Sequence, residues 1–141
     1  MDDPLTLKVA NNLAAIPQAA AEVEVFCATH ALSSRTAHRF NLALEEVLAN
    51  VIAYAFPAGG RHEIDVRIAH RDGRLHATVS DDGVAFNPLT RPTPDLLAPI
   101  EQRQVGGLGI HLLRTLTDTA DYRRDGDRNV LTFSMRLGKP G

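Results

Sequence analysis

A glycine-rich stretch, VGGLGIHLLRTLTD at residues 105–118, places glycines directly before a helical pattern. The first turn of that helix would present free backbone N–H groups, and these groups together with the helix dipole favour a phosphate. The spacing is not that of the phosphate loop that needs a following Lys and Ser or Thr. It is also not that of the dinucleotide fingerprint, which needs a preceding strand. Taken alone, the stretch also fits a flexible hinge.

Two polar residues lie four positions apart in a long amphipathic pattern earlier in the chain. Glu46 and Asn50 fall on one helix face, away from the apolar stripe through Leu44, Leu48 and Val51. We therefore predict that a carboxylate and a carboxamide point the same way, out of the core. The plain alternative is a solvated pair on a helix flank. Asn is nevertheless a poor helix former in the middle of a helix, so its position there calls for a reason.

A third candidate ends an alternating strand pattern, LHATVSDDG at residues 75–83. If the apolar residues of this strand face the core, the period of two carries Asp81 to the same inward side. A carboxylate there must find a hydrogen-bond donor, because burying it unpaired is costly. The alternative is that Asp81 and Asp82 only form a turn before Gly83, as Asp-Gly pairs often do.

Helical and extended patterns indicate which elements hold these residues. Residues 5–10 alternate apolar and polar side chains and are expected to form a strand, and a first helix is expected from Pro17 to roughly Leu32. A second, longer helix begins at a cap, Ser33 or Ser34, and ends before Pro57. Its buried face is predicted to consist of Phe40, Leu44, Val47, Leu48, Val51 and Ala55.

Two β-hairpins are predicted to complete the domain. Residues 63–71 and 74–81 alternate around an Asp-Gly pair, which is a strong two-residue turn signal. Residues 120–124 and 129–137 form a second hairpin across the sequence DGDR. Residues 83–105 contain several prolines and little periodicity, and an irregular segment of that length in a compact domain is usually functional or mobile.

Composition narrows the class of protein. A length of 141 residues fits one domain with its own core, and a formal charge of −2 without a basic aromatic patch disfavours nucleic acid. The acidic N-terminus lacks an apolar signal region, and the most apolar stretch is too short to span a bilayer, so we expect a soluble cytoplasmic protein.

The cysteine and the histidines do not indicate a catalytic or metal-binding site. Cys27 is the only cysteine and falls in the apolar pattern of the first helix, so a buried inert thiol is expected, with a reactive thiol as the alternative. The six histidines lack the paired spacing of zinc ligands, so we predict no structural or catalytic zinc.

In this order and with these separations, three segments resemble a known family. EEVLANVIAYAF, DDGVAFNP and GGLGIHLLRTLTD are similar to the N, G1 and G2 boxes of the GHKL ATPases. Within that superfamily the chain is most similar to the small free-standing bacterial anti-sigma factors with serine-protein kinase activity. The resemblance implies one α/β domain over residues 1–141, the Bergerat ATP-binding fold. In this fold a mixed, mostly antiparallel sheet is covered on one face by helices, with an ATP lid at about residues 88–105.

The resemblance also implies a role for individual residues. Asn50 would ligate Mg²⁺ through its side-chain oxygen, and Glu46 would be the general base that takes the proton of an attacking serine hydroxyl or orients a water. Asp81 would accept a hydrogen bond from the adenine amino group, and Gly83 would let the chain approach the base. The other nucleotide-binding residues that it implies are Phe86, Gly107, Leu108, Gly109 and Ile110.

The implied function is an ATP-dependent kinase that phosphorylates a serine of an antagonist protein and sequesters a sigma factor. One alternative is an interaction module in which ATP or ADP controls partner capture without useful phosphotransfer. The other is a small α/β domain whose glycines and carboxylates are structural and which has no affinity for ATP. The resemblance further implies a homodimer formed through the sheet or the first helix.

Overall fold

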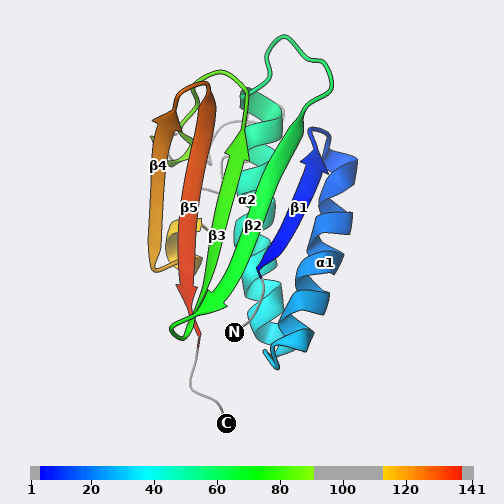
Figure 1. The fold of residues 1–141 in the computed structure, drawn as a ribbon, viewed down its shortest axis with the longest axis vertical. Helices are drawn as coiled ribbons and strands as arrows, with labels where there is room; N and C mark the ends of the chain where they lie inside the picture. Colours follow the sequence, from blue (N-terminus) through cyan, green and yellow to red (C-terminus); the bar gives the residue numbers. More distant parts are fainter. Residues whose placement is uncertain (1–3, 91–112, 138–141) are drawn as a thin grey trace, which may run out of the picture.

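The computed structural model describes residues 4–90 and 113–137, which form a helical layer on one face of a five-stranded sheet (Figure 1). The predicted two-layer α/β fold is confirmed. The sheet has the order β1-β2-β3-β5-β4. The elements are β1 Leu5–Ala10, η1 Leu13–Ala15, α1 Ile16–Thr29, α2 Ser34–Tyr54, β2 Glu63–Arg71, β3 Arg74–Asp81, η2 Pro88–Thr90, β4 Thr119–Asp125 and β5 Arg128–Arg136.

Every described pair of neighbouring strands is antiparallel, where a mixed sheet was expected. The reason is the position of β5. Strands β3 and β4 run in the same direction, but β5 lies between them and runs against both. The register places Val79 opposite Leu131 and Asp81 opposite Asn129, so the end of β3 meets the beginning of β5.

Both predicted hairpins are confirmed. Asp72 and Gly73 connect β2 to β3 with φ angles of 55° and 70°, the left-handed conformations that a tight two-residue turn requires. Gly126, with φ of 60°, and Asp127 connect β4 to β5.

The helices begin and end for local reasons. Ser33 caps α2, where its Oγ accepts a hydrogen bond from the Thr36 backbone N–H at 3.1 Å. Helix α1 ends at Thr29, three residues before the expected end. Ala31 there adopts a left-handed conformation with φ of 58°, and the Leu32 N–H returns to the Cys27 carbonyl at 2.9 Å.

The core lies between the helices and the inner face of the sheet. All six residues of the predicted α2 stripe are buried, which confirms that prediction. Cys27 is also buried, as expected. Burial is the main cause that raises the pKa of its thiol, and the negative charge of Glu24 raises it further. The protonated thiol is a poor nucleophile, in agreement with an inert core residue. Within residues 4–90 and 113–137, no helix has the length and apolar character needed to cross a membrane.

Candidate functional site

Glu46 and Asn50 lie on successive turns of α2, as predicted. The Asn50 Nδ2 atom donates a hydrogen bond to the Glu46 backbone oxygen at 2.7 Å, which fixes the orientation of the carboxamide. The expectation that both side chains point out of the core is wrong for Asn50, whose exposed fraction is 0%. The plain alternative of a solvated pair is also wrong, because Asn50 is buried and Glu46 is half-buried.

The Glu46 carboxyl group is half-buried, and its Oε2 atom accepts no hydrogen bond from the described residues. Burial raises the pKa of Glu46, and the neighbouring negative charge of Glu45 raises it further. A carboxylate with a raised pKa is a stronger base, which suits proton transfer near neutral pH. The site therefore contains a basic oxygen that the described residues do not satisfy.

The raised pKa makes a prediction about stability. A carboxyl group whose pKa is higher in the folded state binds its proton more tightly there. Its contribution to the free energy of unfolding therefore falls as pH rises from the unfolded-state pKa through the folded-state pKa. We expect Glu46→Gln, which mimics the protonated form, to gain stability relative to the native protein as pH increases through that window. Urea unfolding of both proteins between about pH 4 and about pH 8 measures the difference. A difference that does not vary with pH contradicts the assignment.

Asp81 ends β3 and is 1% exposed, which confirms the predicted inward carboxylate. Its Oδ1 atom accepts hydrogen bonds from the Gly83 N–H at 2.8 Å and from Asn129 Nδ2 at 2.9 Å. The bond from the Gly83 N–H closes the turn that was the alternative interpretation of Asp81 and Asp82. The turn and the buried carboxylate therefore occur together. The hydrogen bonds from the described residues reach Oδ1 and not Oδ2.

Asn129 is a site residue that sequence reasoning missed. Its Nδ2 atom also donates to the Val84 carbonyl at 2.8 Å, and its Oδ1 atom accepts from the Phe86 N–H at 3.1 Å and the Tyr122 hydroxyl at 2.6 Å. The buried Asn129 thus holds the loop after β3 against β5. One signal was available. Asn129 is in phase with the inward apolar residues of β5, where a polar side chain needs partners.

Gly83 is required where the loop after β3 approaches α2, and its expected approach to a base stays a prediction. A Cβ atom at Gly83 would lie 2.3 Å from the Ala55 carbonyl oxygen, at the end of α2. The Val84 N–H donates to that same oxygen at 2.8 Å, and the Phe86 ring packs on Tyr54 with centroids 5.4 Å apart. The loop after β3 therefore docks on the last turn of α2, near the turn that carries Asn50.

The remaining predicted residues lie outside the described part of the chain. These are Gly107, Leu108, Gly109 and Ile110, together with residues 91–105 of the expected lid. The first residues of that segment form η2, and the Arg114 guanidinium donates a hydrogen bond to the Leu89 carbonyl within it.

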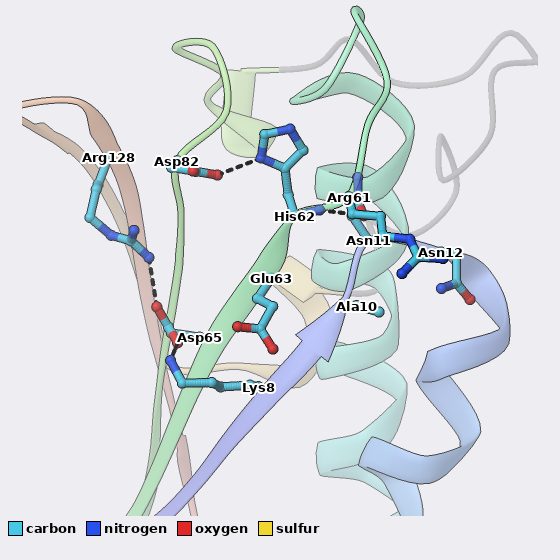
Figure 2. A pocket seen from close by; sticks show the side chains of 10 residues that line it. All are labelled: Lys8, Ala10, Asn11, Asn12, Arg61, His62, Glu63, Asp65, Asp82 and Arg128. Carbon is cyan, nitrogen blue, oxygen red and sulfur yellow. Dashed lines mark hydrogen bonds and ion pairs between the residues drawn. The ribbon is translucent and has the colours of Figure 1, made fainter.

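A separate cavity of about 690 Å³ lies on the open face of the sheet, the face opposite the helices (Figure 2). Figure 2 shows Asp65 between Lys8 and Arg128, with oxygen to nitrogen distances of 2.7 Å to each. His62 approaches Asp82 at 3.0 Å on the same side. These exposed charges neutralise one another, and the cavity contains none of the predicted site residues, so we do not assign the site to it.

Comparison with known proteins agrees with the fold. Residues 9–135 match the histidine kinase-like ATPase domain family. The serine/threonine-protein kinase BtrW of Bordetella bronchiseptica is 29% identical over 104 residues, which cover 72% of each chain. The serine-protein kinase RsbW of Listeria monocytogenes is 31% identical over 96 residues, covering 64% of this chain and 61% of that protein.

A solved structure shows the same fold over nearly the whole chain. The RsbU and RsbW domains of Rv1364c from Mycobacterium tuberculosis superpose with a TM-score of 0.67 at 19% identity, covering 99% of this chain and 34% of that one. Because the family match covers residues 9–135, this protein belongs to the histidine kinase-like ATPase domain family.

Proposed function

We propose that the protein is an ATP-binding regulatory serine/threonine-protein kinase that phosphorylates a serine of an antagonist protein and sequesters a sigma factor. The observation that carries the proposal lies on α2, where a Glu46 carboxylate oxygen that accepts no hydrogen bond from the described residues is one turn from the buried Asn50. The names of BtrW and RsbW as serine kinases support the reaction class. The proposed domain is residues 1–141, with its lid at about residues 88–105. A protein with this function acts in the cytoplasm.

The nucleotide would be recognised at both ends of this site. Asp81 offers Oδ2 to the adenine amino group, while Oδ1 is occupied by Gly83 and Asn129. We assign the base environment to Gly83 and Phe86. We assign the phosphates to Gly107, Leu108, Gly109 and Ile110, because the sequence pattern predicts a helix start there, with free backbone N–H groups.

The residues present fit a magnesium ion. Asn50 supplies a buried side-chain oxygen, the ligand type that a hard cation prefers, and its amide nitrogen is already held by Glu46. When bound, Mg²⁺ neutralises phosphate charge as the phosphoryl group is transferred. Asn50 would hold the ion, and the bond from Nδ2 to α2 would keep that ligand in place.

Glu46 would act directly on the acceptor. Its carboxylate takes the proton from the serine hydroxyl as the serine oxygen forms a bond to the γ-phosphorus, and the bond from that phosphorus to the bridging oxygen of ADP breaks. Partial burial and the Glu45 charge raise the pKa of Glu46, so the base holds this proton more strongly than an exposed carboxylate does. Phosphoserine and ADP are the products.

The first test of this proposal is nucleotide binding. Calorimetry should show that the native protein binds ATP and ADP with an affinity that Mg²⁺ increases. Asn50→Ala should lose at least about tenfold in affinity in the presence of Mg²⁺, the scale seen when support for a metal ligand is removed. Asn41→Ala is a matched control, because Asn41 is also a buried asparagine of α2 but bonds to the Ala20 carbonyl. Native protein that binds no nucleotide, or an Asn50→Ala variant with unchanged Mg²⁺ dependence, contradicts the proposal.

A further inference from the structure

The guanidinium of Arg124, on the outer strand β4, bonds to the loop that follows β3. Its Nη1 atom donates to the Gly83 carbonyl at 2.8 Å and to Asn129 Oδ1 at 3.2 Å, and its Nε atom donates to the Gly126 carbonyl at 3.2 Å. A planar guanidinium can make several directed bonds at once, which a lysine ammonium cannot do in the same geometry. Arg124 therefore ties the turn of the β4–β5 hairpin to the loop beside Asp81.

These bonds determine which way the Asn129 amide faces. Its oxygen meets donors from Arg124, Tyr122 and the Phe86 backbone, so its nitrogen must face Asp81 and the Val84 carbonyl. A flipped amide would set its NH₂ group against those donors. The amide dipole thus directs its positive end at Asp81 Oδ1, with the arginine charge behind it.

The peptide between Gly83 and Val84 continues the same chain of contacts. Its carbonyl accepts from Arg124, and its N–H donates to the Ala55 carbonyl of α2 at 2.8 Å. Hydrogen bonds in such a series strengthen one another by polarisation. Arg124 thereby holds the loop between the sheet edge and α2, although it touches neither Asp81 nor α2 in these bonds.

We propose that Arg124 is a positioning residue for adenine selection: through Asn129 and Gly83 it holds Asp81 with Oδ1 occupied and Oδ2 directed to the exocyclic amine of the base. This inference rests on the proposed nucleotide site and identifies the exocyclic amine of adenine as the group that the site recognises. Hypoxanthine carries an oxygen in place of that amine. An inosine nucleotide therefore has no donor at that exocyclic position and presents an acceptor to the carboxylate there instead.

Calorimetry with ADP and with inosine diphosphate tests the proposal on the native protein and on Arg124→Met. The native protein should prefer ADP. Arg124→Met should lose about tenfold in ADP affinity, as expected for charge-assisted hydrogen bonds at a partly exposed group, with little change for inosine diphosphate. The matched control is Arg123→Met, because Arg123 is exposed on the same strand and its alternation places it on the open face. Arg124→Lys, which keeps the charge, should give an intermediate preference.

The outcomes separate three cases. A reduced preference for ADP in Arg124→Met, absent in Arg123→Met, supports the positioning role. Equal losses for both nucleotides, or no loss, overturn it, because a purely structural arginine would weaken the site without regard to the base. If the native protein binds neither nucleotide, the proposed function fails and this inference fails with it. Thermal unfolding of each variant checks that it is folded. If Arg124→Met is not folded, the ratio of ADP affinity to inosine diphosphate affinity is measured on Arg124→Lys.

Discussion

Replacing Glu46 with glutamine is expected to lower serine phosphotransfer by about 10²–10⁴-fold while ATP binding persists. The substitution keeps the size of the side chain but removes its ability to accept the serine proton. Because the Glu46 carboxylate is half-buried and its Oε2 atom receives no hydrogen bond from the described residues, loss of charge there should leave the surrounding contacts in place. The measurement is transfer of labelled phosphate from ATP to an antagonist protein that carries an acceptor serine.

The adjacent carboxylate provides the control. Glu45 precedes Glu46 on α2 and, by helix geometry, lies on a different face, so Glu45→Gln should retain most of the activity. A Glu46→Gln variant that transfers phosphate at the native rate shows that Glu46 is not the base. A variant that loses transfer but still captures and releases its sigma factor normally favours the interaction module over the kinase.

Adding one carbon at Gly83 is expected to affect both stability and nucleotide binding. The new Cβ atom would lie 2.3 Å from the Ala55 carbonyl oxygen and 2.8 Å from the Ala55 Cβ atom, so the loop or the end of α2 must move. Overpacking of this kind costs about 1–3 kcal/mol of unfolding free energy, and movement of the loop also displaces Asp81. We expect Gly83→Ala to lower the urea midpoint and to weaken ADP binding together.

A glycine in open space separates this clash from the general effect of a methyl group. Gly126 has φ of 60° and nothing within 4 Å of its would-be Cβ, so Gly126→Ala should cost only the backbone strain of a left-handed alanine, about 1–2 kcal/mol. It should leave ADP affinity close to native. If Gly83→Ala binds ADP as well as Gly126→Ala does, docking of the loop on α2 is not what holds the site.

Local patterns in the sequence predicted most of the fold. The Ser33 cap, the apolar stripe of α2 and the Asp72-Gly73 turn each depend on residues within a few positions of one another, so a single segment contains the information. The inward direction of Asp81 follows from strand alternation in the same way. These features could be read without knowing how the segments pack.

The contacts that complete the site could not be predicted in this way. Asn129 reaches Asp81 across 48 positions in the chain, and only the register of β3 against β5 brings them together. Asn129 follows directly on the DGDR turn, where an asparagine is ordinary, and Arg124 is the kind of residue expected on a solvent-exposed strand. Burial of Asn50 likewise depends on what packs on α2, which helix periodicity does not specify. The roles in catalysis and binding assigned to Glu46, Asn50 and Asp81 stay predictions.

The place of β5 between β3 and β4 has a consequence for how the chain folds. The ribbon formed by β1, β2 and β3 is synthesised first, and its β3 edge exposes unpaired backbone groups until a hairpin that follows much later in the chain is inserted beside it. Closing such a distant contact is entropically slow. We therefore expect the Asp81 pocket to be among the last regions of the protein to gain protection from hydrogen exchange during refolding, because its other wall belongs to β5.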